Sequence, residues 1–105
     1  MTLTELKNIL ERTGLPVAYL AFPEEDVPPM PFITYEETGS DNFGADNKVW
    51  YSSSRIQVDL FSFKKNPAME KNLEAVLNEA AIFWERIGEF DENEDCYRTI
   101  YEFII

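Results

Sequence analysis

The feature that most constrains the fold is the stretch 54–81, in which the spacing of apolar residues changes partway along. Ile56, Val58 and Leu60 alternate with polar residues, and this period of two predicts a strand with one buried face. Asn66 and Pro67 then suit the N-cap and the first position of a helix. The helix carries one apolar stripe, formed by Met69, Leu73, Val76, Leu77 and Ala80. A one-sided strand followed by a one-striped helix predicts a helix that lies on a sheet.

The polar residues of this segment are expected to face away from the core. On the helix they are Glu70, Lys71, Asn72, Glu74 and Asn78. On the strand, the second face carries Arg55, Gln57 and Asp59 and continues through Phe61 and Phe63. The two phenylalanines indicate that this second face is not wholly polar.

The rest of the chain supplies a second helix and further strands. A helix is predicted over 2–13, where Thr2 and Glu5 form a capping box and Gly14 suits a left-handed end. The residues 17–20 form either a short strand or an extended connector. Further strands are predicted over 32–36, 49–63, 82–90 and 96–105. The order α-β-β-β-α-β-β predicts one α+β domain over 1–105, with a mixed, mostly antiparallel sheet of four to five strands and two helices packed on it.

Three segments are expected to be irregular. The proline-rich segment 23–31 predicts a loop, and the acidic segment 91–95 predicts a turn. The segment 38–48, TGSDNFGADNK, predicts a long polar turn that joins two strands as a hairpin. Phe43 lies near its middle and either folds back onto the sheet or anchors a partner. The strand that follows is one bent strand or two pieces, with a bulge expected at Ser52–Ser54.

The composition excludes several kinds of chemistry. The chain has no histidine, which removes Ser–His and Cys–His nucleophile pairs and the usual zinc sites. Its single cysteine, Cys96, cannot form an internal disulfide and is typical of a reducing compartment. No apolar run is long enough to span a bilayer, and no signal-peptide pattern opens the chain, so we expect a cytosolic protein without a membrane partner. No catalytic residue, cofactor site or metal site is predicted.

Acidic residues dominate the charge, which is −11. Asp91, Asn93, Asp95 and Glu102 match calcium-loop spacing, but Cys96 replaces the required glycine, so a solvated turn is the favoured interpretation. Seven acids between residues 24 and 46 have no basic neighbour before Lys48. They form either a solvated face or a surface that repels polyanions or meets a basic partner.

Several segments together resemble a family of small proteins from long-tailed bacteriophages and prophages, the tail terminator, tail completion or head–tail joining proteins. The segments are TELKNILERTGLPVAYLAF, PPMPFITYEETGSDNFGADNKVWY, RIQVDLFSFKKNPAMEKNLEAVLNEA, IFWERIGEF and CYRTIYEFII. The resemblance covers nearly the whole chain. It consists of a pattern of elements and common residues and contains no catalytic signature.

The resemblance implies a non-enzymatic virion protein at the head–tail junction, assembled in the host cytoplasm. Such proteins form rings, commonly of six, that contact the tail tube protein on one side and the head connector on the other, while DNA passes through without specific binding. The segment 38–48 would then reach a neighbouring subunit. The candidate interface residues are Asp41, Phe43, Asp46, Lys48, Trp50 and Tyr51.

Two other functions remain compatible with the residues. One is an acidic regulator or inhibitor that binds a basic protein partner, and the other is a small enzyme that uses carboxylates. An enzyme of that kind requires a deep pocket with convergent acids.

Overall fold

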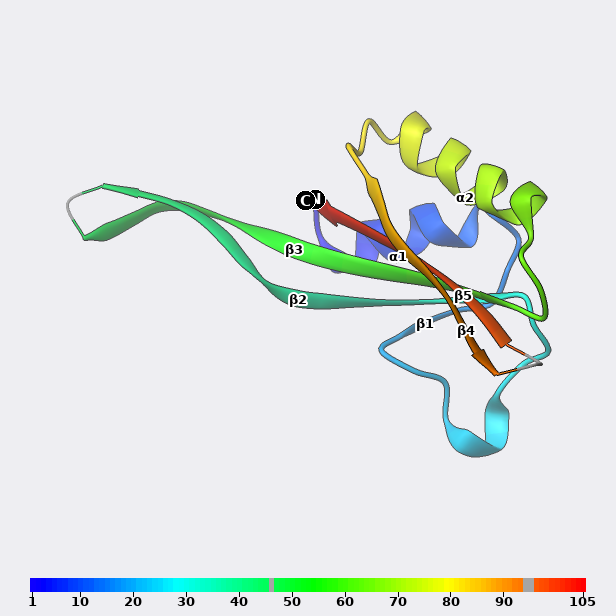
Figure 1. Ribbon diagram of the computed structural model, residues 1–105. Helices are drawn as coiled ribbons and strands as arrows, with labels where there is room; N and C mark the ends of the chain where they lie inside the picture. The colour runs from blue at the N-terminus through cyan, green and yellow to red at the C-terminus, as the bar shows by residue number, and fades with distance from the viewer. Residues whose placement is uncertain (46, 94–95) are drawn as a thin grey trace.

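The computed structural model describes residues 1–45, 47–93 and 96–105, and it confirms the predicted α+β fold and element order. Five strands form one sheet in the order β1-β2-β3-β5-β4, in which β1 is parallel to β2 and the other pairs are antiparallel. Both helices cover one face of the sheet, and the short helix η1 lies beyond the other face (Figure 1). The elements are α1 (Leu3–Glu11), β1 (Val17–Tyr19), η1 (Glu24–Asp26), β2 (Phe32–Ala45), β3 (Lys48–Ser62), α2 (Pro67–Glu79), β4 (Glu85–Asn93) and β5 (Cys96–Ile104).

The helix ends follow the predicted capping. The backbone N–H of Glu5 donates to Thr2 Oγ1 (3.1 Å), and the Glu5 carboxylate accepts from the Thr2 N–H, which completes the capping box. Gly14 has a φ of +83°, the left-handed conformation that glycine adopts without a steric cost. The side chain of Asn66 accepts from the N–H of Met69 (3.2 Å) and so caps α2.

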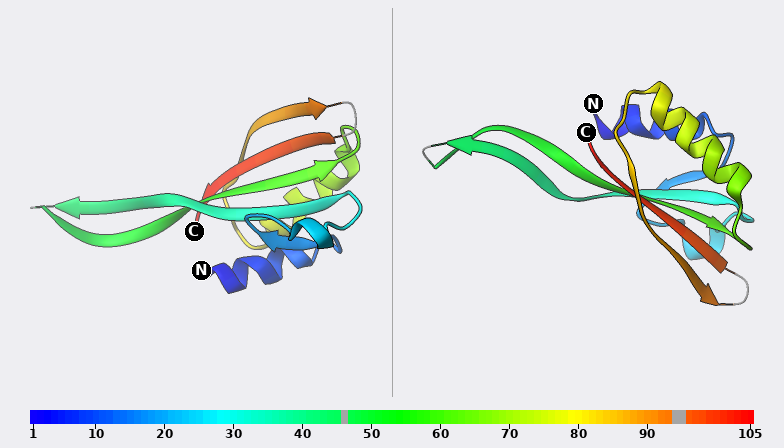
Figure 2. Two further views of the ribbon diagram at one scale, coloured as in Figure 1. Left: turned by 90° about the horizontal axis from the view of Figure 1, so that it is seen from below. Right: turned by 45° about the horizontal axis from the view of Figure 1, so that its top comes forward.

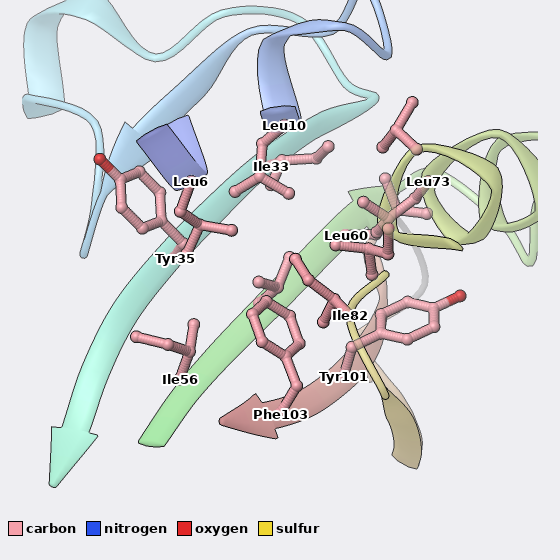
Figure 3. Close-up of a cluster of buried hydrophobic side chains, with 13 residues drawn as sticks. Leu6, Leu10, Ile33, Tyr35, Ile56, Leu60, Leu73, Ile82, Tyr101 and Phe103 are labelled. Atoms are coloured by element: carbon pink, nitrogen blue, oxygen red, sulfur yellow. The ribbon is translucent and has the colours of Figure 1, made fainter. Parts of the chain in front are cut away.

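The core lies between the two helices and the sheet (Figure 3). In the body of the sheet, alternate residues of β2, β3 and β5 point into it, as the period of two predicts. The buried hydrophobic residues are Leu6, Leu10, Ile33, Tyr35, Ile56, Val58, Leu60, Leu73, Val76, Leu77, Ile82, Tyr101 and Phe103. These side chains pack both helices against the body of the sheet in one core.

The prediction that Glu70 faces away from the core is wrong. Its side chain is buried, with the residue only 3% exposed, and its carboxylate contacts Lys65, Arg86 and Thr99. Asn72 and Glu74 are half-buried and also bind other elements, since Asn72 donates to the Thr13 carbonyl (2.9 Å). Helical periodicity alone missed this because a polar group can be buried when partners from other elements satisfy it.

The largest correction concerns the hairpin. The segment 38–48 was expected to be a turn, but β2 continues to Ala45 and is therefore far longer than the predicted 32–36. The strand predicted over 49–63 is confirmed as one continuous strand, β3, which starts at Lys48 and ends at Ser62. Asn47, with a φ of +61°, belongs to the remaining tight connection, whereas Asp46 lies outside the described residues. The serines form no bulge: Ser52–Ser54 pair in register with Asn42, Asp41 and Ser40. The register shifts fall at Thr38 and at Trp50.

Of the last two strands, β5 lies where it was predicted, whereas β4 is displaced toward the C-terminus. Ile82 is buried in the connection after α2, which includes Ala81 at a φ of +59°, and β4 begins only at Glu85. The strand extends to Asn93 through part of the segment expected to be a turn. Glu94 and Asp95, the rest of that expected turn, lie outside the described residues.

Half of the β2–β3 hairpin extends beyond the body (Figures 1 and 2). The pairing of β3 with β5 covers Arg55–Ser62, and the backbone of Ser54 exchanges two hydrogen bonds with Ile105. Beyond that point, among the described residues, β2 and β3 pair only with each other. We call residues 39–53 the arm. It extends for roughly 20 Å at ~3.3 Å per residue, and the molecule measures 51 Å along its longest axis.

Candidate assembly surface

The arm carries all of the candidate interface residues that the structure describes. The register places Phe43 opposite Tyr51, and Lys48 opposite Ala45 next to the tip. Trp50 lies at the register shift between these pairs. Asp46 lies outside the described residues. Phe43 and Tyr51, which are eight positions apart in the sequence, are therefore brought together toward the far end of one two-stranded ribbon.

Asp41 has a partner that the sequence did not suggest. Its carboxylate lies 3.7 Å from the guanidinium of Arg55, at the base of the arm. Both side chains are about half exposed, so this ion pair contributes little to stability. Asp41 is therefore held at the root of the arm, and Lys48 is the charged residue described near its tip.

Among the described side chains of the arm, few interactions add to its backbone pairing. The Ser52 hydroxyl donates to Asn42 Oδ1, and the Thr38 hydroxyl donates to the Arg55 carbonyl (3.3 Å), all at exposed positions. Most of the arm residues whose side chains are described are exposed. A two-stranded ribbon without a buried face is marginally stable in water by itself. The arm is therefore a surface that another molecule would stabilise by covering it.

Both edges of the arm are open. β1 pairs with β2 only as far as Tyr35, and β5 accompanies β3 only to Ser54. Unpaired backbone N–H and C=O groups along such an edge accept an additional strand. The described arm residues thus offer backbone pairing as well as side chains to a partner.

A second surface lies at the opposite end of the same hairpin. It is a pocket of about 210 Å³, open to solvent and lined by Leu20, Ala21, Phe22, Val27, Phe32, Thr34 and Phe61. Phe32 packs against Phe22 and Phe61, with ring centroids 5.1 Å apart in each pair. Sequence reasoning missed this pocket because its aromatic residues come from three separate segments. The aromatic character of the second sheet face at Phe61 was the one signal for it.

Strained backbone helps to form this pocket. Leu20 has a φ of 67°, a left-handed conformation that costs a leucine roughly 1 kcal/mol. Its N–H donates to the Tyr35 carbonyl (2.8 Å), and the N–H of Ala21 donates to the Tyr19 carbonyl. The side chain of Leu20 nevertheless remains 62% exposed at the pocket. Strain at an exposed apolar residue is typical of functional positions.

The rim of the pocket is acidic. Glu24, Glu25 and Asp26 form η1, which lies between the lining residues Phe22 and Val27 in the chain. All three acids are exposed. The described lining of the pocket itself carries no carboxylate, so it lacks the convergent acids that a carboxylate enzyme would need.

Acids also form a row across the uncovered face of the sheet. The register aligns Glu36, Gln57, Glu102 and Glu85 on neighbouring strands. On the same face, Asp59 is buried, and its carboxylate lies 3.7 Å from Arg98. Arg55 and Arg98 lie on either side of this row. Their positive charges confine the negative potential of the acids to a narrow strip of the sheet face.

The buried carboxylate of Glu70 forms a second polar centre, under α2. It accepts from Arg86 (3.0 Å), Lys65 (3.2 Å) and Thr99 (3.3 Å), and Tyr101 donates to the neighbouring Glu74 (2.7 Å). Burial raises the pKa of the Tyr101 hydroxyl, and its hydrogen bond to Glu74 raises that pKa further. These contacts connect α2 to β4 and β5, which is a structural role.

The described residues include no group of three or more acidic or cysteine side chains close enough to hold a metal ion. In the same part of the chain, no helix has the length and apolar character needed to cross a membrane. No model of a known protein family matches this chain, and no curated protein matches it.

Proposed function

We propose that this protein is a non-enzymatic structural subunit that forms a ring, and that it acts as a tail terminator at the head–tail junction of a phage or prophage particle. Its partners in this proposal are further copies of itself, the tail tube protein and the head connector. DNA passes through the ring without being bound specifically. The resemblance in sequence pattern supports the assignment to a phage or prophage particle. The arm supports the part of the proposal that concerns assembly with other subunits.

The observation that carries the proposal is the arm. Residues 39–53 extend from the body as a two-stranded ribbon with open edges, and most of its described side chains are exposed. Ordering such a segment costs conformational entropy that a surface pair of ions does not offset. A partner that covers the arm would supply the missing burial.

The shape of the molecule is compatible with a ring. The arm extends from one end of the hairpin (Figure 1), and the pocket residues Phe32 and Phe61 lie at the other end. Contacts between different surfaces of successive copies are heterologous, and they close into a ring when the rotation per subunit permits it. The net charge of −11 suits a ring through which a polyanion must pass, because binding DNA requires clustered Lys and Arg.

The test is the mass of the protein in solution. Light scattering over a concentration series, at low and high salt, is combined with negative-stain images of the same samples. We expect closed rings of about six subunits, favoured by high salt because screening reduces repulsion between acidic subunits. The matched variant replaces residues 42–52 with Asn-Gly, a turn that closes the hairpin between Asp41 and Ser53. This variant should remain folded and monomeric.

The tail tube protein provides the second measurement. Rings, or ring formation that starts only when tube ends are added, support the proposal. A protein that is monomeric under every condition and does not bind tube ends contradicts it.

The acidic row on the sheet favours one other function. Glu36, Glu102 and Glu85, aligned across β2, β5 and β4, could meet a basic protein. A monomer that displaces a basic DNA-binding protein from DNA, and that loses this activity when Glu102 is changed to Gln, would favour the regulator.

A further inference from the structure

We propose that the apolar pocket at the start of β2 receives the far end of the arm from a second copy of this chain. This inference rests on the proposed function, because it names the surface on which a ring neighbour docks. The occupant is thus a neighbouring subunit, and the contact involves the arm tip of one copy and the pocket of the next.

The position of the two surfaces excludes an intramolecular contact. Phe32 and Phe61 face each other at the pocket end of the hairpin, and Ala45 and Lys48 face each other at the other end. The strand between Phe32 and Ala45 spans about 40 Å at ~3.3 Å per residue. An arm therefore cannot reach its own pocket. Each copy offers one arm and one pocket, so successive copies can dock head to tail.

The pocket has the size and the chemistry for one aromatic side chain. Its volume is about 210 Å³, and its lining is apolar except for Thr34. An apolar cavity of roughly 150 Å³ is known to admit a benzene ring. The far end of the arm carries Phe43, Trp50 and Tyr51 within nine residues of the sequence. Interface hot spots are enriched in Trp and Tyr and lie in well-packed, desolvated pockets.

The charges of the two surfaces are complementary. Lys48, at the tip, is the only Lys or Arg between Arg12 and Arg55, and its side chain is exposed. The pocket rim carries the three exposed acids of η1, Glu24, Glu25 and Asp26. When an aromatic residue of the arm enters the pocket, Lys48 would come close to this rim. Such a pair fixes the register of docking more than it adds affinity.

In the free protein, apolar side chains of the pocket lining are exposed to solvent. Leu20 is 62% exposed and Val27 is 53% exposed, and Leu20 is held in the left-handed conformation. Contiguous apolar surface of this kind marks interaction sites in soluble proteins. Docking of an arm would cover it.

Two complementary variants test the contact. Val27→Asp blocks the pocket and leaves the arm intact, whereas replacement of residues 42–52 with Asn-Gly removes the arm end and leaves the pocket. Each variant alone should be monomeric. Mixed together they should form a 1:1 heterodimer and no larger species, because only one arm and one pocket remain active. Sedimentation at up to about 500 μM detects dissociation constants in the micromolar to sub-millimolar range.

A charge exchange makes the test specific. Lys48→Glu in the arm donor should weaken the heterodimer about fivefold at low salt, and Glu25→Lys in the pocket donor should restore much of this loss. Phe83→Asp in the pocket donor is the matched control. Phe83 is 84% exposed and lies outside the pocket, so this change should leave the affinity unaltered. Circular dichroism and thermal melting confirm that every variant is folded.

The outcomes separate this inference from the proposed function. If the Val27→Asp variant still forms rings as the unchanged protein does, the proposed docking site is wrong, but the proposal that the protein forms a ring stands. If the two folded variants form no heterodimer although the unchanged protein associates, the proposed contact between arm and pocket is also wrong. If the heterodimer forms but tail tube ends are not bound, the arm-to-pocket contact stands and the assignment as a tail terminator fails.

Discussion

The guanidinium of Arg86 donates a 3.0 Å hydrogen bond to the carboxylate of Glu70, although Glu70 lies on the helix face that packs against the sheet. Lys65 and Thr99 donate to the same carboxylate, so the buried charge is compensated from three different elements. Because the three donors come from β5, β4 and the segment before α2, this centre fixes α2 relative to the sheet.

Replacing Glu70 with Gln tests the structural role of this centre. The amide keeps the volume but removes the charge that Lys65 and Arg86 neutralise. We expect the free energy of unfolding, measured by urea denaturation, to fall by about 1–3 kcal/mol. Glu79→Gln on the exposed side of the same helix is the control and should change stability by less than about 0.5 kcal/mol. Equal effects for the two variants would contradict the role of Glu70.

Tyr101 should make stability depend on pH in the alkaline range. Burial, together with the hydrogen bond to Glu74, raises the pKa of its hydroxyl in the folded protein. In the unfolded chain the hydroxyl ionises near its ordinary value of ~10. Its contribution is therefore complete below about pH 10 and is lost progressively as the pH rises above that value.

Tyr101→Phe removes both the hydrogen bond and this ionisation. We expect a loss of about 1 kcal/mol in the free energy of unfolding at pH 7. Above about pH 10, urea denaturation should show a shallower decline of stability than in the unchanged protein. The same alkaline decline in both proteins would show that Tyr101 is not its source.

Leu20→Asn should weaken association without lowering the stability of the fold. Asparagine tolerates a φ of 67° better than leucine does, and the side chain of Leu20 is already mostly exposed. The thermal melting temperature should therefore remain the same or rise slightly, by an equivalent of up to about 1 kcal/mol. The heterodimer described above should weaken by at least about threefold, because an apolar part of the pocket becomes polar.

The converse change at Gly14 checks the backbone argument. Gly14→Ala introduces a Cβ at a φ of +83°, where nothing crowds the added carbon but the backbone conformation disfavours it. It should lower stability by about 1 kcal/mol without altering association. If Leu20→Asn destabilises the fold as much as this change does, the strain at Leu20 is not real.

The three aromatic residues of the arm should matter for assembly and not for folding. Phe43→Ser, Trp50→Ser and Tyr51→Ser should each leave the unfolding transition within about 1 kcal/mol of the unchanged protein. At least one of them should weaken association about tenfold or more, as an interface anchor does. A loss of stability of about 3–5 kcal/mol with unchanged association would instead mean that the aromatic residue packs against its own body.

Local patterns determined much of this protein. The capping box of Thr2 and Glu5, the cap formed by Asn66 and the alternation of Ile56, Val58 and Leu60 each depend on residues that are close in the sequence. Interactions over two to four residues set the helices, their apolar stripes and the buried faces of the strands. The α+β class and the element order follow from these alone.

Only the tertiary structure decided the features that bear on function. Residues 38–45 have the composition of a turn, yet pairing with 48–55 holds them in a strand, because cross-strand hydrogen bonds override weak local preference. Glu70 is buried because Arg86 and Thr99 arrive from strands 16 and 29 residues away in the sequence. The pocket joins Phe22, Phe32 and Phe61 in the same way. Contacts between distant segments depend on how the sheet is assembled, and no local period in the sequence records them.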